Sequence, residues 1–344
     1  MDIAELLIEF SDMNGPSGFE EPVSQRFKEL LEPVVDEIRT DVMGNVIGVK
    51  HSGREGAKKL LLDAHIDEIG FIVTGHEEGF LKFSPIGGIN PRALPAACVN
   101  VLIDPPVFGV VGVLPPHVLK SEDTNRAVKI EDLSIDVGMS QDAVTEAIPL
   151  GTPIVVAQKA RRLGEKCIAG KALDDRAGVV SLLRAMELIG DAKLNIDLYV
   201  MASVQEEVGV RGAVPAAYGV NPDWSIIVDV GFAKTPDMKA PERQQTLGGG
   251  VMICRGPNMN KQLTEQVVSL AKAQDIKYQI EVEPGGNSGT NARAIQISRG
   301  GVATALLSIP LKYMHSPAET VSVDDIETTA KLMCEAVKML SAQV

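Results

Sequence analysis

The amino-acid sequence predicts an α/β protein, in which helices flank a mixed, largely parallel sheet and a small β-barrel domain is inserted. Two observations support this fold class. Helical and strand patterns alternate in the N-terminal and C-terminal parts, which is typical of a sheet covered by helices. Between these parts lie short β-type segments separated by Gly and Pro. We therefore predict a main domain of residues 1–67 and 165–344, and an inserted β-barrel domain of residues 68–164.

The N-terminal part begins with two predicted helices. Apolar residues recur with helical spacing in residues 2–13 and 21–34, and the loop NGPSGFEEP separates the two segments. The following segment, KKLLLDAHIDEIG, contains an apolar run that ends in polar residues. It predicts a strand that is buried along its length and polar at its end.

The middle of the chain has a different pattern. Its strand-like runs are GFIVTG, ACVNVLI, FGVVGVL and TPIVVA, and residues 141–147 are its one helical segment. Turn residues separate runs that are too closely spaced for crossover helices, so a small barrel or sandwich fits better than βαβ units. We predict the barrel.

After about residue 170, helices and strands alternate again. The predicted elements are a helix at 176–189, strands at 196–204 and 224–230, a helix at 260–274, strands at 278–282 and 302–309, and a helix at 323–342. Ser322 precedes the last helix and two acidic residues occupy its first turn, which predicts an N-cap at Ser322.

Composition excludes several classes of partner. The 46 acidic residues exceed the 33 Lys and Arg residues, giving a net charge of −13, so nucleic acid and anionic membranes are not expected to bind. The sequence starts with an acidic segment and has no apolar run of about 18 residues, which argues against a signal peptide and a membrane span. The four cysteines form no CxxC pair, as expected for reduced thiols in a cytoplasmic protein.

Histidines and acids at the ends of predicted strands indicate a metal site. His65 and Asp67 are two residues apart, so on a strand they face the same side and the carboxylate can orient the imidazole. Taken alone, this pair also fits a polar strand end. Asp174 and Asp175 precede a predicted helix, where N-capping is the alternative interpretation.

Other acids and histidines strengthen the interpretation. Glu206 and Glu207 follow one predicted strand, Asp229 ends another, and His315 follows a third. Ligands of open α/β sheets gather at the carboxyl ends of the strands, so these side chains are expected to meet. Two histidines with several carboxylates suit zinc, cobalt or manganese, and the surplus of carboxylates favours two ions. One of the adjacent glutamates can then ligate while the other transfers a proton. His76 and His117 are interpreted as structural.

The motifs HIDEIG, GKALDDRAG, VQEEVGVRGA, VDVG and MHSPAE occur in this order over nearly the whole chain. In this respect the sequence resembles the dinuclear metal aminopeptidases that include glutamyl aminopeptidases, tetrahedral (TET) aminopeptidases and proteins named cellulase M. The resemblance implies a zinc-peptidase-like main domain with an inserted β-barrel that serves in dimerisation and assembly. It also implies a homo-oligomer, a dodecamer built from dimers.

The resemblance assigns roles to individual residues. It implies that His65 and Asp229 bind one ion, that Glu207 and His315 bind the other, and that Asp174 bridges them. Asp67 would orient His65, Glu206 would be the general base, and the Asp174–Asp175 peptide would be cis. At position 291 this chain has Asn where many relatives have Asp, which bears on substrate preference.

The expected reaction is hydrolysis of the amino-terminal residue from peptide substrates, with two divalent ions per subunit. Zinc or cobalt is expected first, with manganese as a third possibility. A dinuclear carboxypeptidase or deacylase is the alternative, and it would bind a substrate carboxylate instead of a free amine. A glycoside hydrolase (cellulase) needs only two carboxylates, so it leaves the histidines unexplained. For the Gly-rich stretch 285–290, substrate binding through backbone amides and an ordinary loop remain equal alternatives.

Overall fold

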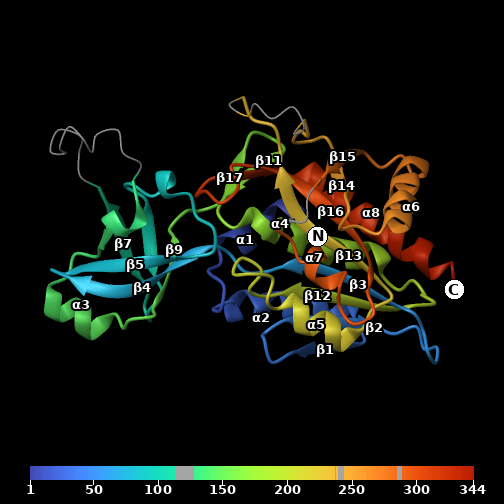
Figure 1. Cartoon of the computed structure of the whole chain (residues 1–344), viewed down its shortest axis with the longest axis horizontal. Helices are drawn as coiled ribbons and strands as arrows, with labels where there is room; N and C mark the ends of the chain where they lie inside the picture. Colours follow the sequence, from blue (N-terminus) through green and yellow to red (C-terminus); the bar gives the residue numbers. More distant parts are fainter. Residues whose placement is uncertain (114–127, 237, 239–243, 285–288) are drawn as a thin grey trace.

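The computed structural model describes residues 1–113, 128–236, 238, 244–284 and 289–344. It consists of a large sheet covered by helices and, set to one side, a closed barrel (Figure 1). The fold class predicted from the sequence is confirmed. Within the described residues, no helix is both long and apolar enough to cross a membrane.

The large sheet has eleven strands, and its main path runs β1-β2-β12-β3-β13-β16-β17-β11-β10. Strands β14 and β15 pair with each other, and β14 also pairs with β16. The strands of the main path are β1 (Glu37–Thr40), β2 (Val46–Lys50), β12 (Asp197–Ser203), β3 (Lys59–His65), β13 (Trp224–Phe232), β16 (Ala303–Lys312), β17 (Glu319–Ser322), β11 (Cys167–Gly170) and β10 (Arg161–Leu163); the other two are β14 (Val251–Arg255) and β15 (Tyr278–Val282).

The four central strands, β12, β3, β13 and β16, run parallel. Their carboxyl ends therefore meet at one edge of the sheet, where Ser203 pairs with His65. The strands on both sides of this centre pair antiparallel. Burial on both faces explains why the central strands are almost continuously apolar.

Helices cover both faces of the sheet. The larger hydrophobic core lies under α1 (Ile3–Asp12), α2 (Glu21–Leu31), α4 (Leu173–Ile189), α6 (Lys261–Ala273) and α8 (Val323–Ser341). A smaller core on the other face packs against α5 (Ala213–Val220) and α7 (Ala292–Ile295). The amphipathic patterns that predicted the long helices correspond to their buried faces.

The barrel has its own core and the strand order β4-β5-β8-β7-β6-β9. Its elements are β4 (Gly70–Glu77), β5 (Phe80–Ile86), β6 (Cys98–Val101), β7 (Val107–Gly112), β8 (Ser134–Asp136), α3 (Gln141–Ala147) and β9 (Pro153–Val156). Phe71 and Phe83 meet edge to face within it, 5.1 Å between ring centroids. Strand β10, although inside the predicted insertion, pairs with β11 in the large sheet.

Some local predictions differ from the structure. Ser322 occupies the N-cap position of α8, but its side chain makes no capping hydrogen bond. Helix α4 starts at Leu173 instead of residue 176, and Asp174 and Asp175 inside it have non-helical backbone angles. Strand β13 extends beyond the predicted end at Val230 to Phe232. Short strands such as β1 and β17 had no prediction, because few of their residues show an alternating pattern.

Candidate metal centre

All predicted site residues come together at the carboxyl edge of the parallel strands. His65 is the last residue of β3, and Asp229 lies near the end of β13. Glu206 and Glu207 follow β12, His315 follows β16, and Asp174 lies at the start of α4. This placement agrees with the expectation that ligands bind at the carboxyl ends of the strands, because the loops after parallel strands lie at the same edge of the sheet.

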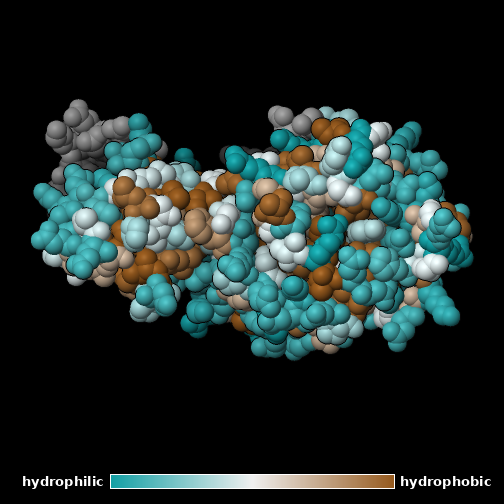
Figure 2. Space-filling view, turned by 90° about the horizontal axis from the view of Figure 1, so that it is seen from below, coloured by the Kyte–Doolittle hydropathy of each residue, from teal (hydrophilic) through white to brown (hydrophobic). Residues whose placement is uncertain are grey.

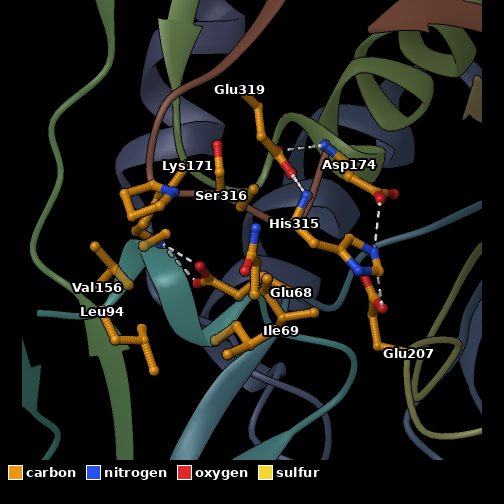
Figure 3. Close-up of a pocket in the computed structure, with 15 residues that line it drawn as sticks. Glu68, Ile69, Leu94, Val156, Lys171, Asp174, Glu207, His315, Ser316 and Glu319 are labelled. Carbon is orange, nitrogen blue, oxygen red and sulfur yellow. Dashed lines mark hydrogen bonds and ion pairs between the residues drawn. The ribbon is translucent and has the colours of Figure 1, made fainter. Parts of the chain in front are cut away.

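Asp174 lies between the two histidines. Its Oδ1 is 3.1 Å from His65 Nε2, and its Oδ2 is 3.3 Å from His315 Nε2. His315 Nε2 is also 3.5 Å from Glu207 Oε2, and His65 Nε2 is 3.9 Å from Asp229 Oδ1. Figure 3 shows the His315 ring between the carboxylates of Asp174 and Glu207. Through these contacts Asp174 links His65, which also faces Asp229, to His315, which also faces Glu207.

Asp175 joins this cluster, although the predicted ligand set omits it. One of its oxygens lies within 4.8 Å of ligand atoms of His65 and Asp229. Its Oδ1 accepts a hydrogen bond from the Gly178 amide at 3.0 Å, which is the capping role considered as the alternative. The Asp174–Asp175 peptide is cis, as predicted. The sequence feature that could have indicated this location of Asp175 is its position directly after Asp174.

Asp67 connects His65 to the glutamate pair. It is fully buried, and its Oδ1 lies 3.3 Å from His65 Nδ1. The same carboxylate accepts hydrogen bonds from the backbone amides of Glu206 at 3.0 Å and Glu207 at 3.2 Å, and from Ser17 Oγ at 2.6 Å. Asp67 therefore positions both the imidazole and the loop after β12. The sequence pattern predicted only its contact with His65.

The electrostatics of the cluster favour bound cations. Burial raises the pKa of Glu206 to about 9 and that of Asp229 to about 8. Burial also disfavours charge on His315, but the neighbouring Asp174 and Glu207 outweigh it and raise the pKa of His315 to about 11. Divalent cations would stabilise the ionised carboxylates and the neutral imidazoles that act as ligands. The donor set of two histidines and several carboxylates thus fits the predicted ions.

The barrel forms one wall of the pocket beside this cluster. On this side the pocket is lined by Ile89, Asn90, Leu94 and Val156. Figure 3 shows Leu94 and Val156 beside a Lys171–Glu68 pair, in which Lys171 Nζ lies 2.7 Å from both carboxylate oxygens. Glu207 and His315 lie at the other end of this pocket.

A glycine allows the barrel to approach the predicted ligands closely. A Cβ on Gly88 would lie 3.2 Å from His315 Nδ1, and one on Gly87 would lie 3.3 Å from the Cβ of Glu207. Gly87 also has a φ of +78°, which favours glycine. The loop after β5 therefore packs its backbone against two predicted ligands, a contact that the strand pattern of the barrel did not indicate.

Asn291 lies beneath the site and not in the pocket. Its Nδ2 donates to Asp63 Oδ2 at 2.9 Å and to Ser203 Oγ at 2.8 Å, and it is 1% exposed. The amide pairs with a buried carboxylate, where Asp would place two like charges together. His76 Nε2 donates to the carbonyl of Ile148 at 2.8 Å inside the barrel, in agreement with a structural role. His117 and residues 285–288 of the Gly-rich stretch lie outside the described residues.

Comparison with known proteins identifies the family. The model of the M42 glutamyl aminopeptidase family matches residues 44–332. The lysyl aminopeptidase of Pyrococcus furiosus is 36% identical over 95% of this chain and 94% of its own length. A TET aminopeptidase from a marine sediment Thaumarchaeota archaeon has a TM-score of 0.93 and 31% identity, covering 99% of this chain and 97% of that chain. The Pyrococcus horikoshii TET1 peptidase, described as assembling into a tetrahedron or a large octahedral shell, has a TM-score of 0.85 and 31% identity, covering 98% and 99%. The chain therefore belongs to the M42 glutamyl aminopeptidase family, whose members are metal-dependent aminopeptidases.

Proposed function

We propose that this protein hydrolyses the amino-terminal residue from peptides with a centre of two divalent ions, zinc or cobalt before manganese. The observation that carries the proposal is the Asp174 carboxylate, which directs one oxygen toward each histidine. His65 and Asp229 would hold one ion, Glu207 and His315 the other, and Asp174 would contact both. When bound, such ions activate water and polarise the peptide carbonyl.

Glu206 is the proposed general base. It is 7% exposed, and its buried Oε1 has no hydrogen-bond partner among the described residues, which supports a role for this oxygen in binding a water. Asp67 holds the Glu206 amide and thereby fixes the start of the side chain. A cation nearby lowers the pKa of a carboxyl, so Glu206 would be ionised at neutral pH. It would take a proton from the attacking water and donate it to the leaving amine.

The side chains that line the pocket favour a free amine over a substrate carboxylate. Among the described lining residues the one lysine or arginine is Lys171, which is paired with both oxygens of Glu68. A carboxypeptidase or deacylase acting on carboxylate substrates would need an available cation here. A glycoside hydrolase would leave the two histidines without a role.

Removal and return of metal test this proposal. Dialysis against a chelator is expected to abolish hydrolysis of a free peptide, and zinc or cobalt is expected to restore it. A peptide with an acetylated amino terminus should resist cleavage, whereas one with an amidated carboxyl terminus should be cleaved. Cleavage of the acetylated peptide from its carboxyl end would instead support the carboxypeptidase alternative. Full activity of a protein shown by elemental analysis to lack metal would exclude the two-ion mechanism.

We further propose that residues 68–164 are an assembly domain and that the protein forms a dodecamer built from dimers. The Pyrococcus horikoshii relative is described as assembling into a tetrahedron or a large octahedral shell, and a tetrahedron with one dimer on each edge contains twelve chains. Hydrophobic side chains reach the surface over the barrel (Figure 2). Phe108 on β7 is 58% exposed and Val110 on the same strand is 37% exposed. The acidic composition and scattered cysteines support the predicted cytoplasmic location.

Charged residues on this surface test the assembly proposal. Phe108→Asp combined with Val110→Asp is expected to shift the particle mass from twelve chains to smaller assemblies, because charges would be buried at the interface. Val282→Asp is the control, since Val282 is 61% exposed on β15 of the large sheet. Mass photometry gives the particle mass directly. If the double variant keeps the wild-type mass while remaining folded, the barrel surface does not direct assembly.

A further inference from the structure

Glu319 makes hydrogen bonds to the backbone of two predicted ligands. It is the first residue of β17 and is 2% exposed. Its Oε1 accepts a hydrogen bond from the amide of His315 at 2.8 Å, and its Oε2 accepts one from the amide of Asp174 at 3.1 Å. Figure 3 shows the Glu319 carboxylate directed toward both residues. One side chain thus joins two segments that are about 140 residues apart in the sequence.

Both amides belong to irregular backbone. His315 has a φ of +60°, in the left-handed region that costs a non-glycine residue about 1 kcal/mol or more. Asp174 has φ −78° and ψ 104° inside α4, and Ala172, two residues earlier, has left-handed backbone angles. Neither segment is fixed by a regular ladder at these positions, so the carboxylate of Glu319 supplies their common anchor.

A carboxylate suits this position because it is an acceptor at both oxygens. Glutamine has the same shape but only one acceptor oxygen, so its NH₂ group would face one of the two amide donors. Aspartate keeps both acceptors but is one methylene shorter. The position therefore requires both the two acceptor oxygens and the length of glutamate.

We infer that Glu319 is a positioning residue of the metal centre, which sets the backbone of Asp174 and His315 and thereby the ion between His315 and Glu207. The inference rests on the proposed two-ion function. That ion would receive two ligands from residues held by Glu319, whereas the ion at His65 and Asp229 would receive one, Asp174. Loss of Glu319 is therefore expected to weaken the first ion more than the second.

The test compares Glu319→Gln with a matched control. Asp325 on α8 is also fully buried and also accepts two backbone amides, from Gly248 and Gly250, each at 2.7 Å. Asp325→Asn therefore makes the same chemical change at a carboxylate that contacts none of the predicted ligands. Thermal unfolding of the metal-free proteins should show a lowered Tm in both variants. Cobalt affinity is then measured by competition with a chromophoric chelator.

Glu319→Gln is expected to weaken one of two cobalt sites by about 10-fold to 100-fold, the usual range for residues that orient ligands. Asp325→Asn should keep both wild-type affinities. At saturating cobalt, kcat of Glu319→Gln should return to near the wild-type value. Glu207→Gln identifies the affected site, because adding Glu319→Gln to it should change the remaining site little.

Several results would overturn the inference. Unchanged affinities in Glu319→Gln, or an equal loss in Asp325→Asn, would show that Glu319 does not act on the metal centre specifically. A wild-type affinity in Glu319→Asp, beside a weakened Glu319→Gln, would show that charge matters and positioning does not. If Glu319→Gln does not fold, Glu319→Asp tests the inference by itself. Its shorter side chain should also weaken cobalt binding if Glu319 positions the ligands. A wild-type protein that binds a single ion would instead contradict the proposed function.

Discussion

Glu206→Gln is expected to lower kcat by about 10²-fold to 10⁴-fold while both ions stay bound, because the change removes a general base and no ligand. Asp67 holds the Glu206 backbone amide, which the substitution leaves intact. The side chain keeps its size, so the buried pocket should keep its shape. KM should change little, because the substrate contacts do not depend on proton transfer.

The neighbouring glutamate provides the contrast. Glu207 Oε2 lies 3.5 Å from His315 Nε2, in the group proposed to hold the second ion. Glu207→Gln should therefore lose that ion and, with it, activity that added metal partly restores. The metal content per chain is measured by elemental analysis together with kcat. The two measurements distinguish the roles of the two glutamates. An empty site in Glu206→Gln together with full loading in Glu207→Gln would mean that the two roles are reversed.

Asp174→Asn is expected to release both ions and to reduce activity to that of the metal-free protein. Each oxygen of Asp174 faces a different histidine. Asparagine offers one oxygen and one NH₂ group, and the latter cannot ligate a cation. Affinity should fall by more than about 100-fold, since a ligand contributes more than the residues that orient ligands.

Asp175→Asn is the matched control for this prediction. Its Oδ1 caps α4 through the Gly178 amide, and an asparagine oxygen can make the same hydrogen bond. Calorimetric titration with zinc should give two ions per chain for Asp175→Asn and none with high affinity for Asp174→Asn. Two tightly bound ions in Asp174→Asn would exclude the bridge. Loss of one ion only in Asp175→Asn would add Asp175 to the ligands of the His65 site.

The architecture, and the clustering of the candidate site residues at one edge of the sheet, could be predicted from the sequence. Helical spacing predicted α1, α6 and α8 to within a few residues, because their apolar faces repeat every three to four residues. Apolar runs ending in His65 and before Glu206 marked strands whose ends carry polar side chains. Parallel strands place such ends at one edge, so the meeting of these residues followed from the pattern. The cis peptide and the assignment of each ligand to one ion came from the resemblance alone, whereas the strand spacing had already placed Asp67 beside His65.

Which atoms of these residues meet could not be predicted from the sequence, because it depends on how the elements pack. Asp67 accepts hydrogen bonds from the Glu206 and Glu207 amides, and Glu319 accepts one from the Asp174 amide. These hydrogen bonds join loops far apart in the sequence, and their geometry depends on irregular backbone angles. Such contacts leave no periodic signal in a sequence. The approach of Gly88 to His315 likewise depends on how the barrel packs against the large sheet. A repeating sequence pattern indicates which face of a helix or strand is buried. The orientation of the side chains in a site is instead set by single contacts between elements.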